Sequence, residues 1–260
     1  MVAILSDKRE FIIRAVKEMY TDVAGHPEKE FHFPTGRPAC EFVGYPADEL
    51  DAIPATAVES FAGVGYPHKS KFIGDGDIVL DIGSGSGTDA LIAALRAGPR
   101  GKIYGLDMTQ AMLAKLRVNV AAAGMSNVEP LEGNAEEIPL PDSSVDVVTS
   151  NGVLNLVPDK ARAFREIARV LKPGGRVQIA DIVVARPISD ECRANPELWA
   201  ECVVGASLEE SYLNLFARAG LTEITVLRRF DYFAGSNSEH TRKVAGSFDA
   251  ASIEVTMRKP

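Results

Sequence analysis

The stretch that decides the fold is VLDIGSGSGTD, residues 79–89, in which three glycines stand on alternate positions directly behind a short apolar run. A turn alone needs one glycine, so this spacing indicates a ligand that presses against the main chain. In an open parallel sheet, ligands bind beyond the carboxyl ends of the strands, often where a strand turns into a helix. The stretch therefore predicts a nucleotide site between a strand and a helix.

The sequence around this stretch alternates short β-branched runs with segments of helical periodicity, which is typical of βαβ units. We expect strands near residues 77–82, 102–106, 127–131, 144–150 and 175–184. Helices are expected near residues 87–97, 109–123 and 159–171. After Gly220 the period returns to two, and two last strands compatible with an antiparallel edge close the chain. These elements predict an α/β fold with a mostly parallel, seven-stranded sheet and helices on both faces.

Two segments outside the alternating pattern are expected to cover the sheet. Residues 1–72 contain an amphipathic helix over residues 6–20, followed by an irregular cap dense in Pro, Gly and aromatic residues. Residues 73–260 form the main domain, in which residues 187–219 are expected to be a helical insertion on the substrate side, before the last two strands. We expect two helices over residues 195–219, the second ending at Gly220.

The overall composition argues against large charged partners. The 260 residues are 46% hydrophobic and carry a net charge of −8, so no basic field is available for nucleic acid or an anionic membrane. A small molecule is the expected partner, and we expect a monomer or homodimer. Early charged residues, three sparse cysteines and the lack of any long apolar window predict a cytoplasmic protein with no signal peptide or membrane span.

The glycine stretch itself narrows the choice of nucleotide. Its spacing is G-x-G-x-G, whereas the dinucleotide fingerprint would need its third glycine at Thr88, and the loop has no lysine for a triphosphate. Asp81 lies at the mouth of the loop, and Asp107 ends the next predicted strand. These carboxylates suit a ribose together with an amine or sulfonium better than a pyrophosphate. Asn134 and Glu136, after the third strand, offer polar groups to an adenine.

Four motifs follow one another in the chain: VLDIGSGSGTD (79–89), GLDMT (105–109), GNAEEIPLPDSSVDVVTSN (133–151) and the turn LKPGG (171–175). Together they resemble the successive motifs of class I S-adenosylmethionine-dependent methyltransferases, over residues 73–185. The resemblance implies a Rossmann-like fold, S-adenosylmethionine as the cofactor and a methyltransferase activity. No metal is expected.

Carried over position by position, the resemblance implies a role for each motif in holding the cofactor. Asp107 would hold the ribose hydroxyls, and Met108 would pack on the adenine. Asn134 stands where many relatives have an aspartate near the adenine amino group. The remaining residues implied to surround the cofactor are Asp81, Gly83, Ser84, Gly85 and Gly87 at the methionine part, Ala135 and Glu136 near the adenine, and Ser150 and Asn151 beneath the sulfonium.

Segments outside the cofactor motifs resemble a smaller group within these methyltransferases. GYPADELDAIPATAVESFAGVGYP (44–67), SNGVLNLVPDK (150–160) and ELWAECVVGA (197–206) resemble the arsenite methyltransferase branch and its UbiE-like neighbours. In arsenite methyltransferases, thiolates of well-separated cysteines hold As(III), because a soft element prefers soft ligands. This chain departs from the pattern: Val64 stands where such relatives carry a cysteine, and SNGVLNL contains no thiol.

Two kinds of acceptor therefore remain open. One is As(III), bound by a rearranged site of Cys40, Cys192 and Cys202, of which Cys202 matches the relatives. The other is an organic molecule enclosed by the cap and the insertion. The side chains expected at the acceptor are Asn151 and Asn155 as catalytic polar groups, Cys40 and Cys202 as substrate thiols, and Phe61, Tyr66, Trp199 and Tyr212 as walls.

Two further functions are kept as alternatives. A protein that binds S-adenosylmethionine without turnover would account for the missing thiols. An NAD-dependent oxidoreductase would share the sheet topology, although the glycine spacing speaks against it. The four histidines show no metal-ligand spacing, and surface or loop roles suit each of them at least as well: His26, His32, His68 and His240.

Overall fold

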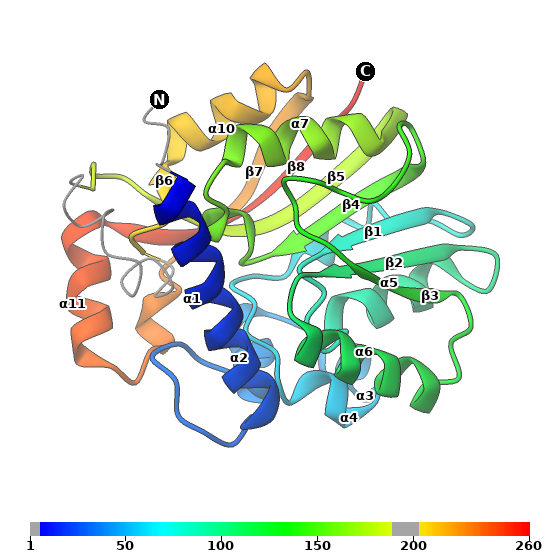
Figure 1. The fold of residues 1–260 in the computed structure, drawn as a ribbon, viewed down its shortest axis with the longest axis horizontal. Coiled ribbons are helices and arrows are strands. Elements are labelled where there is room, and N and C mark those ends of the chain that lie inside the picture. The colour runs from blue at the N-terminus through cyan, green and yellow to red at the C-terminus, as the bar shows by residue number, and fades with distance from the viewer. Residues whose placement is uncertain (1–5, 189–202) are drawn as a thin grey trace.

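The computed structural model describes residues 6–188 and 203–260, and its centre is a sheet with helices on both sides (Figure 1). In the described residues the sheet has eight strands, and its main path runs β3-β2-β1-β4-β5-β8-β7. The strands of that path are β1 (Ile78–Ile82), β2 (Lys102–Asp107), β3 (Val128–Glu132), β4 (Val145–Asn151), β5 (Leu171–Val184), β7 (Thr222–Phe230) and β8 (Ala250–Arg258). The strands β1 to β5 pair in parallel, which confirms the prediction.

The far edge of the sheet is antiparallel, also as expected, because β8 pairs antiparallel with β5 and β7 with β8. The eighth strand, β6 (Ser207–Leu208), is a two-residue strand beside β5 that was not predicted. A helix, α11 (Glu239–Phe248), fills the polar stretch between β7 and β8 and was not predicted either. The Ser238 side chain caps it by accepting a hydrogen bond from the Thr241 amide.

Apart from α11, five helices of ten or more residues in the described part of the chain cover the two faces of the sheet. They are α1 (Ser6–Gly25), α5 (Thr88–Ala97), α6 (Gln110–Ala122), α7 (Lys160–Val170) and α10 (Glu209–Arg218). α5 and α6 lie on one face with α1 packed against α6, whereas α7 and α10 pack together on the other face (Figure 1). Successive residues of β1 point to opposite faces, so Val79 joins the core beneath α5 and Leu80 joins the core beneath α7.

The cap that follows α1 is more regular than expected. It contains three short helices and a 3₁₀ turn: α2 (Gly36–Val43), α3 (Ala47–Asp51), α4 (Ala55–Val58) and η1 (Pro67–Ser70). Gly44 ends α2 in a left-handed conformation that glycine adopts readily. η1 contacts β4, β5 and β8, so the cap covers that part of the sheet beside α5.

The predicted insertion is described only in part. α10 ends at Arg218, two residues before Gly220, close to the predicted helix end. Residues 189–202, which include Cys192, Trp199 and Cys202, lie outside the described residues. The expectation that Tyr212 forms a wall of the acceptor site is wrong, because it is fully buried in the core beneath α7, where its hydroxyl donates a hydrogen bond to Asp181.

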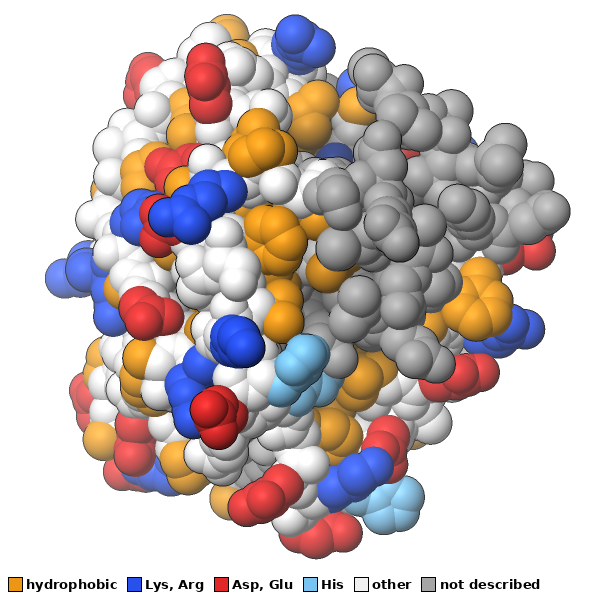
Figure 2. Space-filling model, turned by 90° about the vertical axis from the view of Figure 1, so that its left-hand side faces the viewer, with side chains coloured by type: hydrophobic (Ala, Val, Ile, Leu, Met, Phe, Trp, Pro, Cys, Tyr) orange, Lys and Arg blue, Asp and Glu red, His pale blue; other side chains and the backbone are white. Residues whose placement is uncertain are grey.

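The surface carries charges of both signs. Figure 2 shows Lys, Arg, Asp and Glu side chains interspersed on one face of the molecule, without a continuous basic patch among the side chains described there. Within residues 6–188 and 203–260, no helix has the length and apolar character that a membrane crossing requires.

Candidate functional site

The carboxyl ends of β1, β2 and β4 open into a cleft beside α1. The cleft has about 1060 Å³ of empty space, part of it open to solvent. The strand order reverses between β1 and β4, which is where open α/β sheets bind ligands. The predicted site residues that line the cleft are Phe61, Gly83, Ser84, Gly85, Asp107, Met108, Asn134, Ala135, Glu136 and Asn151.

The glycine loop, residues 83–87, forms the floor of the cleft. The Gly83 amide donates a hydrogen bond to the Leu106 carbonyl at 2.7 Å, which ties the loop to β2. Gly83 and Gly85 have φ angles of +72° and +53°, which non-glycine residues rarely adopt. A Cβ on Gly83 would overlap the side chain of Val153, whereas a Cβ on Gly85 would meet only Met112 Sδ, at 3.9 Å. The bare backbone at Gly85 therefore leaves room for a ligand beside the loop.

Asp107, the last residue of β2, holds the loop from the neighbouring strand. Its Oδ2 accepts the Gly85 amide at 2.9 Å, and its Oδ1 accepts the Thr109 amide at 2.8 Å. Burial raises the pKa of this carboxyl group, and the hydrogen bonds from Thr109 and Gly85 oppose that rise. Each carboxylate oxygen has a further lone pair, so Asp107 can shape the loop and still accept hydrogen bonds from two hydroxyls.

Several predicted site residues do not line the cleft. They are Cys40, Tyr66, Asp81, Gly87, Ser150 and Asn155. Asp81 is 1% exposed, and burial together with the carboxylates of Asp89 and Asp107 raises its pKa. Ser150 is fully buried, and its hydroxyl donates to the Ile82 carbonyl. Neither residue is among those that line the cleft, so a role for Asp81 and Ser150 at the cofactor stays a prediction.

Cys40, an expected substrate thiol, lies on the buried side of α2 and is 0% exposed. Burial raises the pKa of its thiol, and the nearby Asp89 carboxylate adds to the rise. Because the thiolate is the form that binds a soft element, this environment is unfavourable for a metalloid ligand. Cys192 and Cys202 lie outside the described residues, so the three-thiol site stays a prediction.

α1 covers the end of the cleft at β2 and β3. The helix contributes three side chains to the lining: Ile13, Val16 and Tyr20. Arg9 of α1 forms an ion pair with Glu136, which is 3% exposed. Asn134 Oδ1 accepts the Glu136 amide at 2.9 Å, so the turn after β3 is also held from within. The charge of Glu136 is therefore matched by Arg9, and this residue pair fastens the helix over the cleft.

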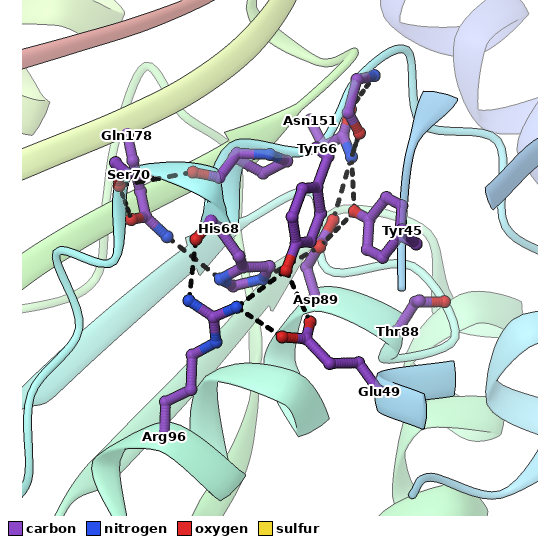
Figure 3. A network of polar contacts seen from close by, with 12 residues as sticks. Tyr45, Glu49, Tyr66, His68, Ser70, Thr88, Asp89, Arg96, Asn151 and Gln178 are labelled. Atoms are coloured by element: carbon purple, nitrogen blue, oxygen red, sulfur yellow. Dashed lines mark hydrogen bonds and ion pairs between the residues drawn. The ribbon is translucent and has the colours of Figure 1, made fainter. Parts of the chain in front are cut away.

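At the other end of the cleft, a network of buried polar contacts joins the cap to β4 and α5 (Figure 3). Asn151 Oδ1 accepts the Val64 and Gly65 amides at 2.7 and 3.1 Å, and its Nδ2 donates to the Gly65 carbonyl at 2.9 Å. The same Nδ2 lies 2.9 Å from the Tyr45 hydroxyl and 3.1 Å from Asp89 Oδ2. The amide predicted to meet the acceptor is thus largely engaged with the protein itself.

The chain segment that Asn151 holds, residues 61–66, is called the strap here. Its first three residues line the cleft: Phe61, Ala62 and Gly63. Tyr66 at its end points away from the cleft, because its hydroxyl donates to Glu49 at 2.8 Å and accepts from Arg96 at 2.8 Å (Figure 3). Of the two expected wall residues in the strap, the structure therefore brings only Phe61 to the cleft. Asn155, an expected catalytic group, is fully buried.

Two members of this network were missed from the sequence. Asp89 lines the cleft and lies two residues after the glycine loop, so its position in the quoted stretch was a usable signal. His68 is 0% exposed, with Nε2 at 3.0 Å from Asp89 Oδ1 and Nδ1 at 3.1 Å from Gln178 Nε2. A surface role is thereby wrong for His68. Nothing local in the sequence marks it, because Gln178 is 110 residues away.

Comparisons with known proteins agree with this architecture. A family model described as a methyltransferase domain matches residues 73–220. An arsenite methyltransferase of Halobacterium salinarum is 39% identical over 186 residues, which cover 72% of this chain and 47% of that protein. A demethylmenaquinone methyltransferase of Listeria monocytogenes is 42% identical over 106 residues, which cover 41% of this chain and 45% of that protein. The chain spans about half the length of these curated relatives.

A similar solved structure is an arsenic(III) S-adenosylmethionine methyltransferase from Chlamydomonas reinhardtii. It aligns with a TM-score of 0.65 and 32% sequence identity, covering 86% of this chain and 73% of that one. The similarity therefore extends beyond residues 73–220 into further parts of the chain.

Proposed function

This chain belongs to the class I S-adenosylmethionine-dependent methyltransferases, and from this premise we propose that it transfers the methyl group of S-adenosylmethionine to a small-molecule acceptor. The observation that carries the proposal is the glycine loop, whose Gly85 amide is held by Asp107 at the floor of the cleft. The relatives named above are methyltransferases of two kinds, which supports the same type of reaction.

The residues of the cleft fit the cofactor. The absence of a side chain at Gly85 leaves room along the loop for the methionine part. Asp107 retains lone pairs for two ribose hydroxyls. Met108 offers an apolar surface to the adenine, and Asn134 lies at the same end of the cleft. We propose that these residues hold the cofactor, together with Gly83, Ser84, Ala135 and Glu136.

The protein's own contribution to methyl transfer is alignment and the exclusion of water. S-adenosylmethionine supplies an activated methyl group on a cationic sulfur. An in-line displacement requires that the acceptor atom face this methyl group and that competing water be removed. α1 covers one end of the cleft and the strap covers the other, so both elements can shield the reacting groups. Asn151 fixes the strap, which makes it a positioning residue in this proposal.

The acceptor that the relatives favour is As(III), and an organic acceptor is the alternative. The buried Cys40 is unfavourable for As(III), whereas the resemblance of ELWAECVVGA to arsenite methyltransferases supports a substrate role for Cys202. Release of S-adenosylhomocysteine in the presence of As(III) and a thiol, or of a panel of organic nucleophiles, tests the proposal. Turnover of As(III) that is lost in Cys202→Ser and kept in Cys40→Ser would identify a metalloid enzyme. Cofactor binding without turnover of any acceptor would instead favour a non-catalytic binding protein.

Two accompanying proposals concern the setting in which the enzyme works. We propose a cytoplasmic location, which the three sparse cysteines support because a reducing compartment keeps thiols free. A monomer or homodimer without a nucleic-acid partner is proposed from the acidic net charge of −8. Size-exclusion chromatography with light scattering tests the oligomeric state, and a larger assembly would contradict it.

A further inference from the structure

In the part of the chain that the structure describes, the charged side chains that line the cleft are all acidic. Three carboxylates line it, those of Asp89, Asp107 and Glu136, whereas the described lining includes neither Lys nor Arg. Arg9 matches the charge of Glu136 from outside the cleft. Asp107 is stabilised by two backbone amides. Asp89 is the remaining carboxylate, and its surroundings differ from those of the other two.

Three side chains contact the Asp89 carboxylate, those of Tyr45, His68 and Asn151. The Tyr45 hydroxyl donates to Oδ1 at 2.5 Å, and Asn151 Nδ2 donates to Oδ2 at 3.1 Å (Figure 3). His68 Nε2 lies 3.0 Å from Oδ1, while the Gln178 amide nitrogen faces His68 Nδ1 at 3.1 Å. Two hydrogen bonds from uncharged donors, Tyr45 and Asn151, therefore hold the carboxylate, and no Lys or Arg of the described residues forms an ion pair with it.

This carboxylate is also removed from water. The Asp89 side chain is 8% exposed, and its exposed part faces the cleft. A buried charge is costly unless it is paired, and hydrogen bonds from neutral donors offset only part of the cost. Its field also reaches Asp81 behind the loop, where it contributes to the raised pKa. A cation that enters the cleft would stabilise this arrangement.

The strand order brings the reacting end of the proposed cofactor to this carboxylate. With the ribose at Asp107, on the end of β2, the rest of the molecule extends across β1 toward β4, because the strands run in the order β3-β2-β1-β4. Asn151 ends β4, and Asp89 lies in the first turn of α5, directly after the loop that follows β1. A cofactor placed in this way would bring its sulfonium end to the part of the cleft that Asp89 lines.

We infer that Asp89 is a specificity-determining residue, which favours the cationic sulfonium of S-adenosylmethionine over the neutral thioether of the product. The inference rests on the proposed function, since it takes S-adenosylmethionine as the ligand of the cleft. Methyl transfer forms a bond from an electron pair of the acceptor to the methyl carbon and breaks the bond between that carbon and sulfur. The electron pair of the broken bond stays on sulfur. The cofactor thereby loses its sulfonium charge. A fixed negative charge thus holds the substrate form more strongly than the product form, which aids exchange of product for fresh cofactor.

Calorimetric titration of Asp89→Asn with S-adenosylmethionine and with S-adenosylhomocysteine tests the inference. The substitution removes the charge and keeps the size of the side chain. The dissociation constant for S-adenosylmethionine should rise about tenfold, equivalent to about 1.4 kcal/mol, while that for S-adenosylhomocysteine should change by less than about twofold. Tyr45→Phe is the matched control, because it removes a hydrogen bond to the same carboxylate and keeps the charge. Its ratio of the two constants should equal that of the parent protein.

The outcomes separate the inference from the proposed function. Weakening of both ligands by the same factor in Asp89→Asn, or an unchanged ratio, would overturn the inference alone. Failure of the parent protein to bind either ligand would overturn the proposed function, and the inference with it. If Asp89→Asn does not fold, the affinity of the parent protein for sinefungin is compared with its affinity for S-adenosylhomocysteine. Sinefungin carries an ammonium-bearing carbon in place of the sulfonium. Tighter binding of sinefungin than of S-adenosylhomocysteine supports the inference, and equal or weaker binding contradicts it.

Discussion

The side chain of Asn151 accepts the backbone amide of Val64 at 2.7 Å, which joins two residues that are 87 positions apart in the chain. The neighbouring Gly65 amide is held by the same oxygen at 3.1 Å. Because the strap lines the cleft, the Asn151 side chain contributes to the geometry of the acceptor side. Asn151, at the end of β4, therefore acts by positioning the strap that lines the site.

Replacing Asn151 with alanine should lower the free energy of unfolding by about 2–3 kcal/mol, because two strap amides lose their acceptor in a part-buried place. Asn127→Ala is the matched control, since it removes a single hydrogen bond to the Gly98 carbonyl and should cost about 1 kcal/mol or less. Urea unfolding followed by circular dichroism measures both. Equal losses in the two variants would show that the strap does not depend on Asn151.

Alanine at Gly83 should destabilise the protein more than alanine at Gly124. Both glycines have positive φ, +72° and +64°. A Cβ at position 83 would also overlap Val153, whereas no atom lies within 4 Å of a Cβ at position 124. The backbone cost common to both is about 1 kcal/mol, and overpacking should add about 1–3 kcal/mol at Gly83 alone. Similar urea midpoints for the two variants would contradict the tight contact between the loop and Val153.

His32 should give the stability a pH dependence on the acid side. Burial lowers the pKa of its imidazole from 6.5 to about 4. Between these values the unfolded chain binds more protons than the folded one, so stability falls as the pH drops through this window. Over that pH range the free energy of unfolding of the parent should fall by about 2 kcal/mol more than that of His32→Gln. The partial exposure of the ring keeps this difference below the value that the full pKa shift would give.

Urea unfolding at a series of pH values measures this difference. His26→Gln is the control, because the His26 side chain is 63% exposed and its loss should leave the steep decline in place. A decline that is just as steep in His32→Gln would assign the acid sensitivity to other groups.

Most of the fold could be predicted from the sequence, because the βαβ pattern is repeated and depends on neighbouring residues. The predicted strand 77–82 corresponds to β1 (Ile78–Ile82), and the predicted helix 109–123 corresponds to α6 (Gln110–Ala122). α11 was missed because its sequence, EHTRKVAGSF, is short and polar and contains Gly246, which weakens a helix prediction. The cap helices were missed for a similar reason, since Pro and Gly interrupt them every few residues.

Residues of the site could be predicted from the sequence only where short continuous segments of the chain form the site. Gly83, Gly85 and Asp107 could be placed because a loop and a strand end carry them to the same edge of the sheet. The partners of Asn151 and His68 come from the cap and from β5, and such pairings depend on tertiary packing that periodicity does not report. Burial of Cys40 belongs to the same class, because it follows from how α2 packs and not from the residues around it.

The central claim is that the glycine loop and Asp107 hold S-adenosylmethionine, and calorimetric titration of the parent protein and of Asp107→Ala tests it most directly. Asp146→Ala is the control, because Asp146 pairs with Lys172 and the Ile78 amide at the opposite end of the strands. The parent and the control should bind one equivalent with similar affinity, and Asp107→Ala should bind at least about tenfold more weakly, the loss expected when a charged hydrogen-bond acceptor is removed. No binding by the parent, or unchanged affinity in Asp107→Ala, would contradict the claim.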